Sequence, residues 1–265
     1  MVEMLLVNAA VLVTVVLTLW AISVKIGDVS FIDSFWGAGM ALMAFASWLQ
    51  VEERGVLAHL LLAMTAAWGL RLGIYLLRRW REEGEDKRYE RMLRKDREKG
   101  RFAFAALTKI WLGQAVLLFL VSSPAQVGIL TSDPAQQLTA LTLAGLALYL
   151  AGIFFEWVGD WQLSQFKKDP SNKGEVMDKG LWRYTRHPNY FGDACAWWGI
   201  WLVVASVSWE VALWTVAGPL FLTFTLVKWS GAALLEKGMK HTRPGYEEYK
   251  KRTSPFIPMP PKKSA

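Results

Sequence analysis

The sequence is poor in the residues that build disulfides and metal sites. It has one cysteine, Cys195, so no disulfide can form within the chain. Its three histidines are scattered and no cysteines cluster with them, which argues against a structural zinc site. Acidic residues number 23 against 30 basic ones, so the acidic excess typical of calcium proteins is missing. No Gly-x-Gly-x-x-Gly motif follows a strand-like run, so we expect no Rossmann domain and no bound metal.

Apolar and aromatic side chains, in contrast, are abundant. Hydrophobic residues make up 53% of the 265 positions, and the mean hydropathy is +0.23. The chain has 15 tryptophans, a residue that collects at membrane–water interfaces because its ring has one polar edge. These features favour an all-α, polytopic integral membrane protein over a soluble domain.

About seven transmembrane helices are predicted from apolar runs of roughly 20 residues, the length that crosses a bilayer. The first run has no basic cluster before it and no cleavage site of small residues, so we interpret it as a retained helix. Residues 123–136, which contain two prolines, are predicted to form a loop. The seven runs are residues 4–24, 31–50, 56–77, 102–122, 137–159, 191–208 and 209–229.

The basic residues are distributed unevenly between the two predicted faces of the membrane. Of the 30 lysines and arginines, 26 lie in residues 78–101, 161–190 and 228–265. With seven spans these segments share one face, and residues 123–136 and 206–210 on the other face contain none. The positive-inside rule then places the basic face and the C-terminus in the cytoplasm, and the N-terminus outside.

The cytoplasmic segments mix basic residues with aromatic and acidic ones. Arg88 is followed by Tyr89, and Tyr184 is followed two positions later by Arg186. Asp160 ends a predicted span and shares a helix face with the carboxylate four residues before it. Basic groups suit phosphates, carboxylates suit ribose hydroxyls and aromatic rings suit a base, so a nucleotide cofactor is one candidate ligand. For any single basic residue, attraction to anionic lipid is the alternative.

One motif carries a family resemblance: residues 182–193 read Trp-Arg-Tyr-Thr-Arg-His-Pro-Asn-Tyr-Phe-Gly-Asp. It resembles the signature of the steroid 5-alpha-reductase C-terminal domain superfamily, and especially of its uncharacterised bacterial branch. It is also similar to the sterol C14 and delta-7 reductases, and isoprenylcysteine methyltransferases share a shorter Arg-His-Pro version. Residues 33–37, 85–89 and 244–258 resemble the same group, so the resemblance covers about residues 30–258.

The resemblance implies a membrane oxidoreductase that takes hydride from NADPH and saturates a carbon–carbon double bond of a steroid- or isoprenoid-like lipid. By position in the motif, Asn189 and Asp193 match residues at the nicotinamide half of the cofactor. Asp160 and Lys167 match residues that hold its ribose and phosphate. The resemblance and the charge pattern together add these cofactor-binding candidates: Arg71, Lys87, Arg88, Tyr89, Tyr184, Arg186, His187, Glu236, Tyr246 and Tyr249.

Asp33 and Tyr190 are the candidates for polarising the substrate or supplying the proton. An acid near the start of a span is a functional candidate by default, but Asp33 is equally suited to cap a helix. Tyr190 either donates a proton or packs at the interface. The Gln-Glu pair and the tyrosine that polarise the ketone in reductases of 3-oxo-steroids are not matched. Asp33 has no glutamine beside it, and Trp68 stands at the position of the tyrosine.

Two other functions stay open from the sequence. One is a membrane methyltransferase that uses S-adenosylmethionine, although Glu236 is not followed by the second glutamate of that group. The other is a non-enzymatic lipid binder. We expect one membrane domain, with residues 1–101 on the substrate side and residues 102–265 forming the reductase-like part. Its expected partners are a lipophilic small molecule and membrane lipids, with no nucleic acid, in a bacterial inner (cytoplasmic) membrane with the cofactor side facing the cytoplasm.

Overall fold

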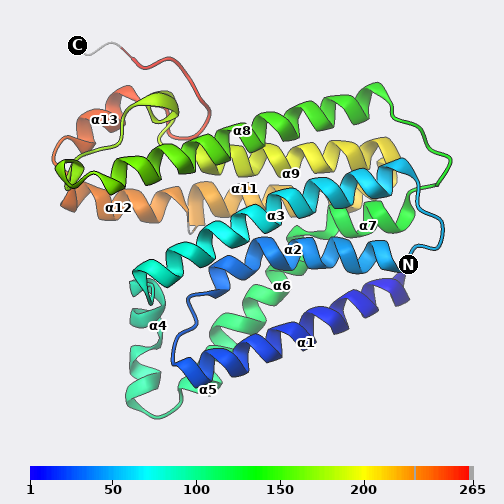
Figure 1. Ribbon diagram of the computed structural model, residues 1–265, viewed down its shortest axis with the longest axis horizontal. Coiled ribbons are helices and arrows are strands. Elements are labelled where there is room, and N and C mark those ends of the chain that lie inside the picture. The colour runs from blue at the N-terminus through cyan, green and yellow to red at the C-terminus, as the bar shows by residue number, and fades with distance from the viewer. Residues whose placement is uncertain (230, 263–265) are drawn as a thin grey trace. The chain divides into compact units, whose positions relative to one another are not determined.

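The computed structural model describes residues 1–229 and 231–262, and all the regular secondary structure in this part of the chain is helical (Figure 1). This confirms the predicted all-α, polytopic membrane protein. The chain forms two compact units: Met1–Thr139 with Val203–Gly218, and Ala140–Leu202 with the chain from Pro219 onward. Within the described residues, six helical runs are long and apolar enough to cross a membrane. They are α1 (Val2–Ile26), α3 (Val56–Glu83), Phe102–Val121, α8 (Ala140–Lys168), α9 (Pro188–Val207) and Trp209–Trp229.

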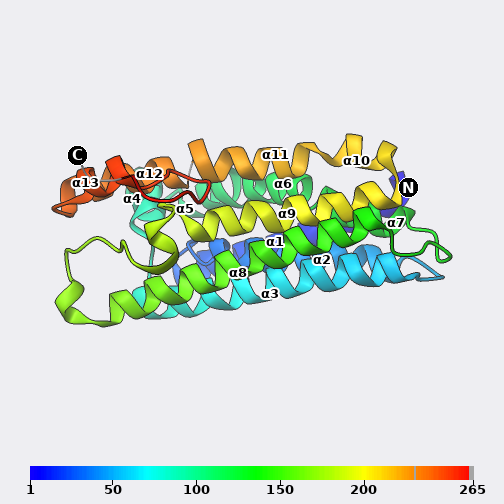
Figure 2. The ribbon, with the colours of Figure 1, turned by 90° about the horizontal axis from the view of Figure 1, so that it is seen from above.

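The second predicted span corresponds to helix α2 (Ile32–Leu49), which has 18 residues and is not among the six. In the first unit, α2 lies beside α3 in both views (Figures 1 and 2). The backbones of the two helices meet at Gly37 and Gly69, where a Cβ on either glycine would collide with the carbonyl oxygen of the other. Small residues at such crossings let membrane helices approach closely, so α2 packs directly against the backbone of α3.

The predicted loop at residues 123–136 is wrong over most of its length, because it contains helix α7 (Ser123–Thr131). Pro124 lies in the first turn of this helix, where no backbone N–H donor is needed, so the proline starts a helix here rather than ending one. Gln126 of α7 is fully buried and accepts a hydrogen bond of 2.9 Å from the Asn8 amide of α1. The preceding span consists of α5 (Phe102–Ala105), η1 (Ala106–Trp111) and α6 (Leu112–Val121).

Helix α4 (Lys87–Glu98) follows the end of α3 after a short turn. Asp86 caps its first turn by accepting a hydrogen bond of 2.8 Å from the backbone N–H of Arg88. Tyr89, Leu93 and Asp96 are buried, and their spacing places them on one helix face. The densely charged segment of the sequence is therefore an amphipathic helix.

In the second unit, α8 and α9 pack along a line of glycines. A Cβ on Gly152 would lie 2.6 Å from the carbonyl oxygen of Gly192, and a Cβ on Gly199 would lie 2.7 Å from that of Gly145. Helix α8 continues well past the predicted end at residue 159, which places Asp160 inside a helix rather than at its end. The remaining elements are η2 (Pro170–Asn172), η3 (Gly180–Arg183), α10 (Trp209–Thr215), α11 (Ala217–Phe224), η4 (Thr225–Trp229), α12 (Ala232–Thr242) and α13 (Tyr246–Arg252).

Candidate cofactor site

The close contact of α8 and α9 brings two predicted cofactor-binding residues together. The Asn189 amide of α9 donates a hydrogen bond of 3.0 Å to Asp160 Oδ1 of α8, and the Asp160 side chain is buried. The Trp182 indole N–H donates to the carbonyl oxygen of Gly159 at 3.0 Å, which ties the turn before the motif to the same part of α8. Asp193 is buried one helical turn after Asn189 on the same helix. The polar end of this helix pair is therefore held by side chains of the motif itself.

The C-terminal tail pairs with the motif segment in a short parallel bridge between Thr185 and Ser254. The backbone N–H of Arg186 donates to the carbonyl oxygen of Ser254 at 2.9 Å, and the Thr185 hydroxyl donates to that of Phe256 at 2.7 Å. In Figure 1 the tail, shown in red, runs beside the green loop that leads into α9. The tail therefore fixes the backbone from which Arg186 and His187 project.

Glu236 of α12 joins the two basic residues of the motif. Its Oε1 atom lies 3.2 Å from Arg186 Nε and 3.1 Å from His187 Nε2, and its Oε2 atom lies 4.0 Å from Lys250 Nζ. Burial acts to raise the pKa of Glu236, but the hydrogen bond with His187 and the charge of Arg186 outweigh it, so the pKa lies below its usual value. Glu236 is thus a carboxylate at neutral pH that balances one of the neighbouring positive charges.

Three donor atoms in this cluster make no hydrogen bond within the described part of the chain: Arg186 Nε, Arg186 Nη1 and Tyr246 Oη, and both residues are more than 90% buried. Arg186 Nε has the Glu236 carboxylate as an ion-pair partner, so Arg186 Nη1 and Tyr246 Oη are the two donors left without an acceptor. Burial, and then the Glu236 charge, raise the pKa of Tyr246 to about 12, so its phenol keeps its proton at neutral pH. A buried donor without an acceptor lowers stability by about 1–3 kcal/mol, so native structures rarely leave such a donor unpaired. The oxygen acceptors of a phosphate or a carboxamide fit this pair of donors.

Two aromatic residues complete the cluster. The rings of Tyr190 and His187 stack, with centroids 5.4 Å apart and planes at 8°. The Tyr249 phenol donates to the carbonyl oxygen of Trp182 at 2.6 Å, and burial raises its pKa. Tyr249 is therefore engaged in holding the turn before the motif. Tyr184 and Lys167 are both exposed to solvent.

A second polar group lies in the first unit, around Asp33 at the start of α2. Arg88 Nη2 lies 2.7 Å from Asp33 Oδ2 and 2.9 Å from Asp86 Oδ2, and the Tyr89 phenol donates to Asp33 Oδ1 at 2.6 Å. Burial and then the Asp33 charge raise the pKa of Tyr89. Burial acts to lower the pKa of Arg88, but Asp86 and Asp33 raise it above its usual value. Both Asp33 oxygens therefore accept hydrogen bonds from α4.

Two of the remaining candidates in the first unit lie outside this group. Arg71 lies within α3 with its guanidinium 5.1 Å from the centroid of the Tyr75 ring, and Lys87 is exposed. Two residues that position the site, Asp86 and Trp182, lie in the segments that carry the family resemblance but were not among the predicted site residues. The signal for Asp86 was present, because an aspartate directly before a charged helical run is typical of an N-cap. Trp182 opens the motif, but its positioning role was not visible in the sequence, because its hydrogen-bond partner is 23 positions away.

The fold and these sites define a polytopic α-helical membrane protein with buried polar clusters next to its spans. The family described as "Protein of unknown function (DUF1295)" matches residues 19–253, and the chain belongs to this family. Three curated relatives are 3-oxo-5-alpha-steroid 4-dehydrogenases 1, which supports the predicted membership of the steroid 5-alpha-reductase superfamily.

The similarity to these relatives is partial. The enzymes of Mus musculus and Rattus norvegicus are 29% identical and that of Macaca fascicularis is 30% identical over 119 residues, which is 44% of this chain. The matched region spans 41% of the mouse enzyme and 40% of the rat and macaque enzymes, so the chain spans about two fifths of the length of these relatives. No solved structure matches the chain.

Proposed function

We propose that this protein is an NADPH-dependent membrane reductase that saturates a carbon–carbon double bond of a lipophilic, steroid- or isoprenoid-like substrate. The observation that carries the proposal is the pair of buried donors, Arg186 Nη1 in the motif and Tyr246 Oη in the C-terminal segment that resembles the same superfamily. The names of the relatives support reduction of a lipid, since each is a 3-oxo-5-alpha-steroid 4-dehydrogenase.

The chain's own residues have distinct roles in this proposal. Arg186 and Tyr246 would hold acceptor oxygens of the cofactor, with Glu236 fixing the Arg186 guanidinium and its charge. Asn189, oriented by Asp160, would hold the nicotinamide half through its amide group. When bound, NADPH supplies the hydride. The apolar spans would take up the lipophilic substrate and exclude water, which strengthens every polar contact within the site.

Each unit contains one candidate donor for the proton that reduction of the double bond requires. In the first unit Asp33 accepts two hydrogen bonds, and the proton of that group resides on the Tyr89 phenol. Asp33 therefore acts by positioning and polarising Tyr89 rather than as an acid itself. In the second unit the candidate is the Tyr190 phenol, whose ring stacks on His187.

We propose the first 101 residues as the substrate side and the remainder as the cofactor side, with the cofactor side facing the cytoplasm.

Fluorescence titration of the purified protein in detergent with NADPH tests the proposal. The wild type should bind NADPH, and Asn189→Ala, Lys167→Ala and Arg186→Lys should each weaken binding by about tenfold, the effect of losing one charge-assisted hydrogen bond. Arg186→Lys keeps the positive charge but removes Nη1. Lys168→Ala is the matched control for Lys167→Ala, because it removes an equally exposed neighbouring lysine.

Three outcomes contradict the proposal. Absence of NADPH binding to the wild type refutes it directly. Binding of S-adenosylmethionine in its place identifies the protein as a methyltransferase. If neither compound binds but a lipid does, the protein is a lipid binder that lacks this chemistry.

A further inference from the structure

The first unit contains a cavity of about 370 Å³, and Asp33, which the proposed function places beside Tyr89, lines one part of it. It lies between the first turn of α2, the last turns of α3 and the turn that leads into α4. Its size falls within the range of roughly 300–1,000 Å³ typical of small-molecule sites. The residues that line it are Ser30, Asp33, Leu76, Arg79, Trp80, Glu83, Gly84, Glu85, Asp86 and Lys87.

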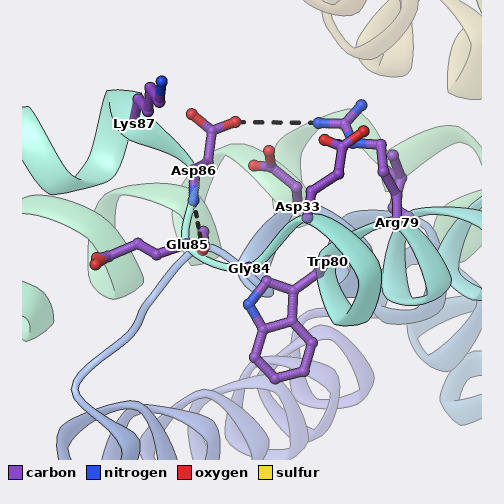
Figure 3. Close-up of a pocket in the computed structure, with 10 residues that line it drawn as sticks. Asp33, Arg79, Trp80, Gly84, Glu85, Asp86 and Lys87 are labelled. Carbon is purple, nitrogen blue, oxygen red and sulfur yellow. Dashed lines mark hydrogen bonds and ion pairs between the residues drawn. The ribbon is translucent and has the colours of Figure 1, made fainter. Parts of the chain in front are cut away.

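The cavity presents both signs of charge. Figure 3 shows the side chains of Asp33, Arg79 and Asp86 directed toward one another, whereas Lys87 points outward. Arg79 is held only loosely, with Nε 3.5 Å from Glu83 Oε2 and Nη2 4.0 Å from Asp86 Oδ2. Its guanidinium therefore has donors available for a further acceptor.

Charged groups of both signs surround the cavity. Four carboxylates line it, those of Asp33, Glu83, Glu85 and Asp86. Four cations line it or pair with these carboxylates: Arg79 and Lys87 in the lining, Arg88 on Asp33 and Asp86, and Arg97 on Glu85. Asp28 adds a fifth carboxylate, because it accepts hydrogen bonds from Ser30 and Trp80 in the lining. Because the surroundings carry both signs of charge, they suit a ligand that has one charge of each sign.

The position of the cavity points to the chemical class of that ligand. Arg79, Trp80 and Glu83 belong to the last turns of the membrane-spanning helix α3, which places the cavity at the level of lipid headgroups. The Trp80 ring forms part of the wall, and its indole N–H is fixed by a hydrogen bond of 2.7 Å to Asp28 Oδ2. Tryptophan favours this interface, and its ring face attracts cations.

We infer that this cavity binds the headgroup of a zwitterionic aminophospholipid. The primary ammonium group donates hydrogen bonds to the carboxylates of Glu83 and Asp86, and the phosphate accepts from Arg79 and, at the rim, from Lys87. This site shares the Asp33 wall with the proposed reaction, but the residues that hold the headgroup, Arg79, Glu83 and Asp86, have no role in that reaction. Phosphatidylethanolamine is preferred over phosphatidylcholine, whose quaternary ammonium has no N–H to donate. It is also preferred over phosphatidylglycerol, which carries a net negative charge.

Native mass spectrometry of the full-length protein tests the inference. The protein is equilibrated in detergent with phosphatidylethanolamine, phosphatidylcholine or phosphatidylglycerol of identical acyl chains, and the retained lipid is measured. Phosphatidylethanolamine should be retained best, and Glu83→Gln and Arg79→Gln should each reduce its retention by up to about fivefold, as for a partly exposed ion pair. Glu90→Gln and Arg94→Gln, which change the same charges on the exposed face of α4, serve as matched controls and should have no effect.

Two results overturn the inference. One is equal retention of the three lipids, or better retention of phosphatidylglycerol, by the wild type. The other is an equal loss of phosphatidylethanolamine in the cavity variants and in the α4 controls, since it would show a general effect of charge. A circular dichroism spectrum like that of the wild type for each variant separates loss of the site from loss of the fold.

Discussion

Replacing Gly192 with alanine tests whether the contact between α8 and α9 positions the cofactor site. A Cβ at this position would lie 2.5 Å from the carbonyl oxygen of Gly152 and 2.9 Å from Cα of Glu156. Both obstacles are backbone atoms, so relief requires the helices to separate by about 1 Å toward ordinary van der Waals distance. Overpacking of this kind costs about 1–3 kcal/mol. The same separation would stretch the Asn189–Asp160 hydrogen bond beyond its useful range.

The assay is thermal denaturation in detergent followed by tryptophan fluorescence. At roughly 2–4 °C per kcal/mol for a chain of this size, Gly192→Ala should lower the Tm by about 2–12 °C and also weaken NADPH binding. Gly238→Ala is the matched control, because a Cβ at this exposed position in α12 has no neighbour within 4 Å. The control should leave the Tm unchanged or raise it slightly, because alanine has a higher helix propensity than glycine. If Gly192→Ala behaves like Gly238→Ala, the helix contact does not hold the site.

Three further predictions concern other contacts. Glu236→Gln should lower stability at pH 7, because it leaves the Arg186 charge without its carboxylate. The lowered pKa of Glu236 makes this stabilisation present above about pH 4.5 and lost as the pH falls through the folded-state pKa, so the Tm difference from the wild type should vanish in acid. Tyr89→Phe should lower the free energy of unfolding by about 1–2 kcal/mol, measured by chemical denaturation, because it removes the hydrogen bond to Asp33. Deletion from residue 253 onward should expose the motif segment and speed its cleavage by trypsin.

Each of these predictions has its own control. For Glu236→Gln, a Tm difference between the wild type and the variant that stays constant from pH 7 to pH 3.5 would contradict an ionised Glu236 carboxylate as the source of the stabilisation. For Tyr89→Phe, the comparison is Tyr184→Phe, which changes an exposed phenol and should cost nothing. For the deletion, cleavage within residues 84–101 serves as the reference, and equal acceleration there would indicate general unfolding rather than release of the motif.

Hydropathy and charge along the sequence were enough to establish the class of protein. Membrane spans can be predicted from long apolar runs without tertiary information, because a helix that crosses a bilayer satisfies its own backbone hydrogen bonds. This is why most predicted spans agree with the observed helices to within a few residues at their starts. The motif at residues 182–193 likewise identified the family, since it depends only on local residue order. The wrong loop at residues 123–136 shows where local signals fail, because Pro124 reads as a helix breaker unless its place in the first turn is known.

Only the tertiary structure decided which of the polar residues work together. Asp33 was predicted as a candidate for polarising the substrate or supplying the proton, and the structure joins it to Arg88 and Tyr89, more than 50 positions later in the sequence. Glu236 pairs with the motif across 49 positions. The glycines of α8 recur every seven residues, at 145, 152 and 159, but that pattern does not say which helix packs against them. Such contacts depend on how helices pack, which residue order along one helix does not specify. The sequence determined the membrane class and the family, and the packing of the helices determined the clusters of charge.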